Sequence, residues 1–134
     1  MSNMSNGKIV SCNLINLAKS EKLTLDYCHR RTKTLERILD LDEFEITVVK
    51  CNECGKIFIK CFKEYRTGGW DEYIHIFWIP VEDNDLENIR KTKNLAWFMM
   101  DLVTNRSHIC CWPSAKTLHW AKGKSNVSAI AFLP

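Results

Sequence analysis

The chain has 134 residues, a formal net charge of +3, and hydrophobic side chains at 46% of its positions. This length fits one domain that can bury a core without obligatory cross-links. No stretch approaches the roughly 20 apolar residues that a membrane-spanning helix needs. A charge of +3 is too small to indicate a nucleic-acid partner by itself. The composition therefore predicts a single globular domain that does not span a membrane.

The seven cysteines indicate the compartment of the protein. Their odd number argues against a closed disulfide framework, and the polar segment 1–7 lacks the pattern of a signal peptide. Free thiols persist in reducing compartments. We therefore expect a cytoplasmic protein whose segment 1–7 is a disordered tail.

Two helices are predicted in the first third of the chain. Apolar residues between Ser11 and Ala18 favour a short helix, although Ile9 to Cys12 could equally begin a strand. Residues 24–41 favour a longer amphipathic helix, because Thr24 is a suitable N-cap and apolar positions recur at spacings of three and four. The residues expected on its inner face are Leu25, Cys28, Thr32, Leu35 and Leu39.

Three strands are predicted in the centre of the chain. Residues 44–50, 56–66 and 73–79 are rich in β-branched and aromatic residues, and the second segment has apolar side chains on both faces. Gly68 and Gly69 permit a tight turn before the third strand, because glycine adopts positive φ without steric cost. These segments predict an antiparallel meander whose middle strand lies inside the sheet.

The last part of the chain predicts a helix and further strands. Residues 84–106 have an acidic beginning, a basic end and an apolar face that includes Trp97, with a bend expected at Lys93 and Asn94. Residues 107–112 predict a strand, 117–121 an edge strand, and 127–133 an apolar segment that docks on the domain. Together these elements predict one α+β domain, residues 1–134. We expect an antiparallel sheet of three to five strands, with the helices 24–41 and 84–106 packed on it.

Charge is distributed unevenly along the chain. Six acids and no Lys or Arg occur between residues 67 and 89, whereas no acid follows Asp101. An acidic and aromatic loop is typical of a contact surface for a basic partner, although an uneven solvated surface is the alternative. The predicted partner-binding residues are Trp70, Asp71, Glu72, Glu82, Asp83, Asp85 and Glu87.

The spacing Cys51-x-x-Cys54-Gly55 is typical of a zinc knuckle, in which two thiolates approach one ion and glycine permits the turn beneath them. The chain has no second C-x-x-C pair, so the other ligands of a structural zinc would come from Cys110, Cys111 or His108, with His108 and Cys111 as the predicted pair. Only one of the adjacent cysteines Cys110 and Cys111 could ligate, because neighbours on a strand point to opposite faces. The same spacing fits a metal-free turn between two strands. It fits a redox dithiol less well, because such a pair usually begins a helix. No other cofactor is expected.

Two further functions remain open. His108 and Cys111, with His75 or His119, could form the Cys/His pair of an enzyme, although sequence spacing cannot show contact in space. A zinc-supported nucleic-acid-binding module would use basic and aromatic residues near the C-terminus. These residues are His108, Trp112, Lys116, His119, Trp120, Lys122 and Lys124. No complete catalytic signature is present in the sequence, so a binding function is favoured over an enzymatic one.

The motifs in the centre of the chain resemble those of a known class of proteins. Cys51-x-x-Cys54-Gly55 precedes an aromatic strand, and Gly68-Gly69-Trp70-Asp71-Glu72-Tyr73 opens a strand that ends at Pro80. In these features, about a quarter of the chain resembles small bacterial immunity proteins encoded beside polymorphic or contact-dependent growth-inhibition toxins. The resemblance implies one α+β domain that binds a cognate toxin domain, often a nuclease, and blocks its active site. Many nuclease inhibitors are acidic, whereas this chain has a charge of +3, so binding would depend on the local acidic region.

Overall fold

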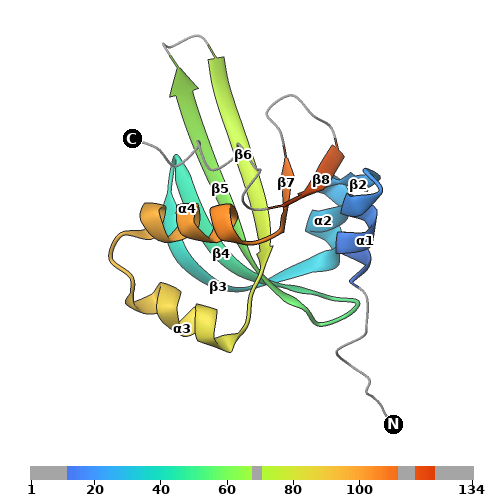
Figure 1. The fold of residues 1–134 in the computed structure, drawn as a ribbon, viewed down its shortest axis with the longest axis horizontal. Helices are drawn as coiled ribbons and strands as arrows, with labels where there is room; N and C mark the ends of the chain where they lie inside the picture. Colours follow the sequence, from blue (N-terminus) through green and yellow to red (C-terminus); the bar gives the residue numbers. More distant parts are fainter. Residues whose placement is uncertain (1–11, 68–70, 112–116, 123–134) are drawn as a thin grey trace.

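The computed structural model describes residues 12–67, 71–111 and 117–122, which form four helices and seven strands (Figure 1). All seven strands belong to one antiparallel sheet with the order β2-β8-β7-β6-β5-β4-β3. The helices are α1 (Asn13–Lys19), α2 (Leu25–Arg31), α3 (Asp83–Lys91) and α4 (Leu95–Asn105). The strands are β2 (Leu23–Thr24), β3 (Thr32–Leu41), β4 (Phe44–Cys51), β5 (Ile57–Thr67), β6 (Asp71–Pro80), β7 (His108–Cys111) and β8 (Thr117–Ala121).

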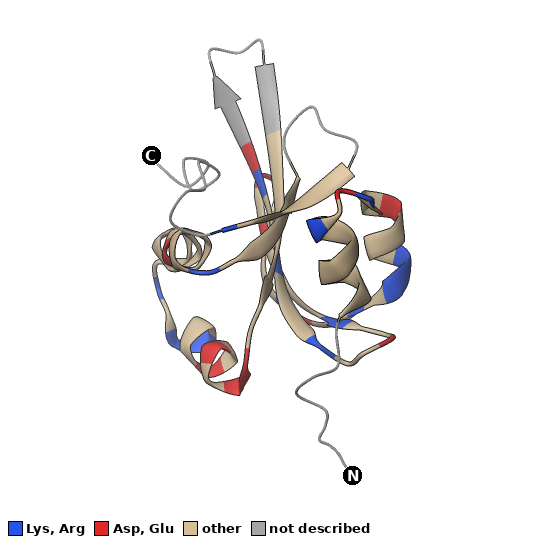
Figure 2. Ribbon diagram, turned by 45° about the vertical axis from the view of Figure 1, so that its right-hand side comes forward, with Lys and Arg blue, Asp and Glu red and all other residues tan. Residues whose placement is uncertain are grey.

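Helices cover both faces of the sheet. α1 and α2 lie against one face, and α3 and α4 lie against the other (Figures 1 and 2). Alternate side chains of a strand point to opposite faces, so one strand can fill both layers. Ile59 of β5 packs in the same apolar cluster as Ile89 of α3, whereas its neighbour Phe58 packs with Leu14 of α1. The interior therefore consists of two apolar layers with the sheet between them.

The β5–β6 hairpin is longer than the strands beside it. Pairing between β4 and β5 extends only to Lys63, and pairing between β6 and β7 begins only at Ile76. β5 and β6 remain paired with each other as far as Thr67 and Asp71. This end of the hairpin therefore extends beyond the neighbouring strands.

The sheet is larger than the sequence predicts. The class is α+β, as expected, but the prediction of three to five strands and two main helices is wrong, because four helices cover a seven-stranded sheet. One additional strand, β2, has only two residues and is too short to be recognised from a pattern. β8 is not an edge strand, since it lies between β2 and β7. The edges are β2 and β3.

The largest local error concerns residues 24–41. The helix begins as predicted, with the Thr24 hydroxyl accepting a hydrogen bond from the Tyr27 backbone N–H at 3.1 Å, but it ends at Arg31. Residues 32–41 form β3, which pairs with β4 and has two shifts of register. Such irregularities disturb the two-residue alternation by which a strand is recognised in a sequence.

The predicted helix 84–106 is two helices. α3 ends at Lys91 and α4 begins at Leu95, so the break falls at the predicted bend. The Asn94 side chain accepts a hydrogen bond from the Trp97 backbone N–H at 3.0 Å and caps the second helix. A polar N-cap in this position explains why the chain starts a new helix after the break.

The other predicted elements agree with the structure where it describes them. α1 is the short first helix, and β4, β5, β6 and β7 correspond to the predicted strands, with β5 inside the sheet. The predicted tail 1–7 and the docking segment 127–133 lie outside the described residues. None of the helices formed by the described residues combines the length and the apolar character needed to cross a membrane.

Candidate functional site

The predicted acidic contact residues are divided between the two ends of β6. Asp71 and Glu72 begin this strand, and Glu82 follows its end at Pro80. Because a strand rises about 3.3 Å per residue, the backbones of the two acidic groups lie about 30 Å apart. Trp70 and the side chains of Asp71 and Glu72 lie outside the described part of the chain. The acidic run of the sequence therefore does not form one continuous surface.

Asp85, one of the predicted partner-binding acids, forms contacts inside the domain. Its side chain is 12% exposed, and its two oxygens accept hydrogen bonds from both terminal nitrogens of Arg106, at 2.6 and 2.8 Å. Oδ2 also accepts a hydrogen bond from the Glu82 backbone N–H at 2.9 Å. Hydrogen bonding to Arg106 holds the pKa of Asp85 below its usual range. This carboxylate therefore joins α3 to the end of α4 instead of facing a partner.

Exposed acids lie on α3 and α4, the two helices that cover one face of the sheet. Asp83 and Glu87 are one turn apart on α3, where the acidic positions are visible in Figure 2, and Asp101 is exposed on α4. Trp97 precedes Asp101 by one turn and is 63% exposed, more than any other large hydrophobic residue in the described ranges. Helix positions four apart share a face, so Trp97 and Asp101 are neighbours on the outside of α4. We call these four residues the α3–α4 surface.

The predicted zinc ligands are brought together only in part. Cys51 and Cys54 lie in the turn between β4 and β5, whereas His108 and Cys111 lie on β7. His108 is fully buried, with its ring 5.6 Å from that of Phe77 in the layer beneath α3 and α4. Cys51 is part of the layer beneath α1 and α2, so the sheet separates it from His108. Cys111 also packs against the layer beneath α1 and α2. Its Sγ atom, however, is not among the cysteine Sγ atoms that lie close to that of Cys51.

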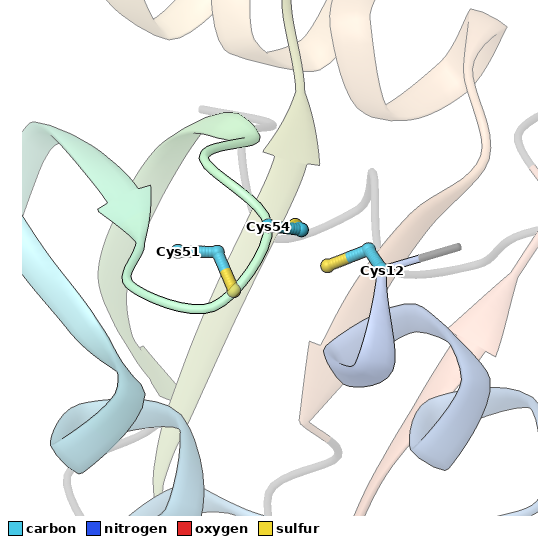
Figure 3. A group of neighbouring side chains, drawn as sticks. All are labelled: Cys12, Cys51 and Cys54. Carbon is cyan, nitrogen blue, oxygen red and sulfur yellow. The ribbon is translucent and has the colours of Figure 1, made fainter. Parts of the chain in front are cut away.

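Cys12 completes the sulfur group instead. The Sγ atoms of Cys12, Cys51 and Cys54 all lie within 4.8 Å of one another (Figure 3). Cys12 occupies the N-cap position of α1, and the other two cysteines lie in the turn after β4. Gly55 has a φ of 80°, and its N–H donates a hydrogen bond to the Cys51 carbonyl at 2.9 Å, which closes the turn. Cys12 is distant from this turn in the sequence, so no local spacing indicates it.

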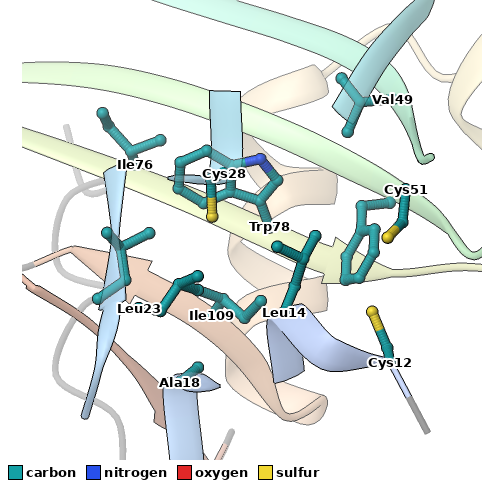
Figure 4. Close-up of a cluster of buried hydrophobic side chains, with 12 residues drawn as sticks. Cys12, Leu14, Ala18, Leu23, Cys28, Val49, Cys51, Ile76, Trp78 and Ile109 are labelled. Carbon is teal, nitrogen blue, oxygen red and sulfur yellow. The ribbon is translucent and has the colours of Figure 1, made fainter. Parts of the chain in front are cut away.

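Cys12 and Cys51 belong to the apolar layer beneath α1 and α2 (Figure 4), and Cys54 packs against this layer. Cys12 is 5% exposed, Cys51 is fully buried and Cys54 is partly exposed. Burial raises the pKa of the Cys12 thiol to about 12, and a hydrogen bond with Cys54 contributes to the increase. At neutral pH Cys12 is therefore protonated, and a metal ion would have to displace its proton.

A thiol–imidazole contact occurs at a different position from the predicted one. Sγ of Cys110 and Nε2 of His119 are 3.2 Å apart, at paired positions of β7 and β8. Cys110 is fully buried in the layer beneath α3 and α4, whereas Cys111, the predicted residue, packs against the opposite layer. Burial lowers the pKa of His119, so its imidazole is neutral at neutral pH. A fully buried sulfur cannot reach a substrate in this conformation.

Among the described residues of the predicted nucleic-acid-binding segment, His108 is buried, His119 and Trp120 are partly buried, and Lys122 is exposed. His108 is buried, and the partly buried ring of Trp120 lies 5.5 Å from Nζ of Lys19 on α1. These contacts tie both side chains into the domain, so they are not open stacking platforms. The prediction also included Trp112, Lys116 and Lys124, which lie outside the described residues.

A cavity of about 440 Å³ lies between α2 and the adjoining face of β3, β4, β5 and β6. Nζ of Lys60 is 3.1 Å from Nε2 of His29 and 5.5 Å from the centre of the Trp78 ring. Burial lowers the pKa of Lys60, and burial together with the Lys60 charge lowers the pKa of His29. A neutral His29 can accept a hydrogen bond from the Lys60 ammonium group. Arg37 and Glu45 also line this cavity, which sequence reasoning missed because its residues share no motif.

The comparisons with known proteins leave the family of the chain open. No protein-family model, curated protein or solved structure matches the chain. The kind of partner or ligand must therefore be inferred from the chemistry of the surfaces described above.

Proposed function

We propose that the protein is a non-enzymatic binding protein, specifically an immunity protein that neutralises a cognate bacterial toxin domain through the α3–α4 surface. The observation that supports this proposal is the exposure of Trp97, 63%, on a helix whose other face fills an apolar layer. An exposed tryptophan contributes little to folding, whereas tryptophan is among the residues that contribute most binding energy at protein interfaces.

The acids of the α3–α4 surface favour a basic partner, whereas the basic residues Arg90 and Lys91 lie in the last turn of α3. Asp83 and Glu87 are exposed on α3, and Asp101 accompanies Trp97 on α4. An acidic surface accelerates association with a basic protein and disfavours acidic competitors. Nuclease domains bind phosphate groups with Lys and Arg, so the substrate-binding face of a nuclease toxin has the required charge.

The test uses the purified chain and the domain encoded by the gene immediately upstream, which we expect to be a toxin. Trp97→Ala should weaken binding about 30-fold or more, which corresponds to about 2 kcal/mol, in calorimetric titrations. The double variant Asp83→Lys/Glu87→Lys should lower the association rate and remove its dependence on salt. Activity assays of the toxin domain should show inhibition by the unchanged chain.

Two matched controls lie on the opposite face of the sheet. Ile74→Ala removes a hydrophobic side chain that is 40% exposed beside the cavity under α2. Asp26→Lys reverses an exposed acid on α2. Both should leave the affinity unchanged. Equal affinity in Trp97→Ala, the double variant and the controls would contradict the proposed surface, and a toxin domain that is neither bound nor inhibited would contradict the proposed function.

A further inference from the structure

We propose that Cys12, Cys51 and Cys54 bind one Zn²⁺ ion, with a solvent molecule as the fourth ligand. This site is independent of the α3–α4 surface, because the three cysteines border the layer on the other side of the sheet. It retains Cys51 and Cys54 from the sequence-based zinc hypothesis and has Cys12 in place of His108 and Cys111.

The sulfur positions are close to those of a tetrahedral zinc site. Zn–S bonds of about 2.3 Å at tetrahedral angles place two sulfur atoms about 3.8 Å apart. The three Sγ atoms lie within 4.8 Å of one another, and Figure 3 shows them converging from α1 and from the β4–β5 turn. Each sulfur would have to move by less than about 1 Å, which side-chain rotation can supply.

The turn that carries two of the ligands is held by its own backbone hydrogen bonds. The Cys51 N–H donates to the Lys56 carbonyl at 2.9 Å, and the Gly55 N–H donates to the Cys51 carbonyl at 2.9 Å. Positive φ at Gly55 allows the backbone to fold beneath the two sulfurs, as in a zinc knuckle. Cys51 and Cys54 are therefore preorganised for one ion, and Cys12 approaches from a separate element.

The donor chemistry favours zinc. The group consists only of sulfur, which prefers Zn²⁺ to the hard cations Mg²⁺ and Ca²⁺. Thiolates without a counterion would be unfavourable here, because Cys12 and Cys51 are almost completely buried. A divalent cation compensates this charge as the thiols release their protons to solvent. Cys54 is partly exposed, so the ion and a solvent ligand can reach the group from its side.

A bound ion would connect the first helix to the sheet. α1 contributes the buried residues Leu14 and Ala18 to the layer beneath it, and Cys12 immediately precedes the helix. An ion shared between Cys12 and the β4–β5 turn would add a covalent-like connection to this apolar contact. Zinc should therefore stabilise the folded chain by mass action, with a higher unfolding temperature in the metal-bound form.

The test measures metal binding by the full-length chain. Protein produced with added zinc and purified under a non-chelating reductant should contain one zinc per chain by elemental analysis. Co²⁺ added to the metal-free, reduced protein should produce the near-ultraviolet charge-transfer absorption of thiolate ligands. Cys12→Ala and Cys54→Ser should each lower zinc affinity about 100-fold or more and remove this absorption.

The control variants are Cys61→Ala, which lies in the opposite layer, and Cys111→Ala, a partly exposed cysteine on β7. Both should keep one zinc per chain. Circular dichroism establishes that each variant is folded, and Cys54→Ser changes the least buried member of the group if Cys12→Ala does not fold. Three results would overturn the proposal: no stoichiometric zinc and no Co²⁺ absorption in the reduced chain, unchanged affinity in Cys54→Ser, or a disulfide within the group in protein purified under reductant.

Discussion

Arg106, at the C-terminal end of α4, and Asp85, in the first turn of α3, form a bidentate ion pair with distances of 2.6 and 2.8 Å. The Asp85 side chain is 12% exposed, so this pair is better shielded from solvent than the pairs Arg30–Asp26, Arg31–Glu53, Arg37–Asp40 and Arg90–Glu36. It joins the two helices that carry the α3–α4 surface. The relative position of Trp97 and the α3 acids thus depends on an interaction within the domain.

Asp85→Ala should lower the free energy of unfolding by about 2 kcal/mol. The substitution leaves Arg106 without this carboxylate and removes the acceptor of the Glu82 N–H at the start of α3. Urea denaturation measures the change. Glu36→Ala is the matched control: it breaks the Arg90–Glu36 pair, whose side chains are 48% and 37% exposed, and it should cost less than about 1 kcal/mol. Equal losses in the two variants would argue against a special role for the Asp85 pair.

Acidification should destabilise the domain through its histidines. Burial is the main cause that lowers the pKa of His29, His75, His108 and His119 in the folded state. The unfolded chain, with a histidine pKa of about 6.5, therefore binds more protons than the folded chain as the pH falls below this value. The corresponding stability is complete above about pH 6.5 and is lost toward the lower, folded pKa values.

Thermal melts at pH values between about 7.5 and 5.5 should show this loss as a falling Tm. A second decrease is expected below about pH 4, because Asp85 has a lowered folded pKa and its stabilisation requires the ionised carboxylate. Asp85→Ala should reduce only the second decrease, to which Glu36 also contributes because hydrogen bonding to Arg90 lowers its pKa. A Tm that stays constant down to about pH 5.5 would contradict the lowered pKa values of the histidines in the folded state.

Much of the central sheet was predictable because each strand contains its own signal. Phe58 and Ile59 pack on opposite faces, as alternation along β5 predicts. β3 has no such signal, since its register with β4 shifts between Thr34 and Glu36 and again further along. The sequence predicts Leu35 on the buried face of a helix, but its side chain lies on this strand and is 49% exposed. The irregular spacing of apolar residues in β3 is close to the period of a helix. The pairing of β3 with β4 is needed to show that the segment is a strand.

The candidate sites were predictable only where their residues are neighbours in sequence. The turn from Cys51 to Gly55 was recognised locally, whereas Cys12 joins it only through the docking of α1. The sequence predicts Trp97 on the inner face of a helix over 84–106 that bends at Lys93 and Asn94. The break after Lys91 starts a new helix at Leu95, which changes the phase of the apolar face and leaves Trp97 outside. The spacing of apolar residues alone does not show where one helix ends and the next begins, so it cannot predict this rotation of the apolar face.

Gly55→Ala should destabilise the chain by about 1 to 2 kcal/mol, because an L-residue disfavours the left-handed region. The φ of 80° is the cause, since a Cβ at this position would lie 3.8 Å from Cε of Lys50, which is an ordinary contact. Gly55→Asn serves as the control, because asparagine tolerates positive φ better than alanine. Urea denaturation should therefore show a smaller loss for Gly55→Asn. Similar losses in both variants would show that space, and not backbone conformation, selects glycine.

Lys60→Met should raise the pKa of His29. The Lys60 charge contributes to lowering that pKa, through a contact of 3.1 Å between Nζ and Nε2, while the partial desolvation of His29 is retained in the variant. The methionine side chain keeps an unbranched apolar stem but carries no charge. NMR titration of the His29 ring protons measures the shift, which should be upward toward about 6.5.

Lys63→Met provides the control within the same strand. Lys63 contributes to lowering the pKa of His75, so its removal should raise the pKa of His75 and leave that of His29 unchanged. Side chains an odd number of positions apart on a strand point to opposite faces. Lys60 and Lys63 are three positions apart, so their charges act on different histidines. An unchanged pKa of His29 in Lys60→Met, or a shift of both histidines in both variants, would contradict the pairing of Lys60 with His29 in the cavity.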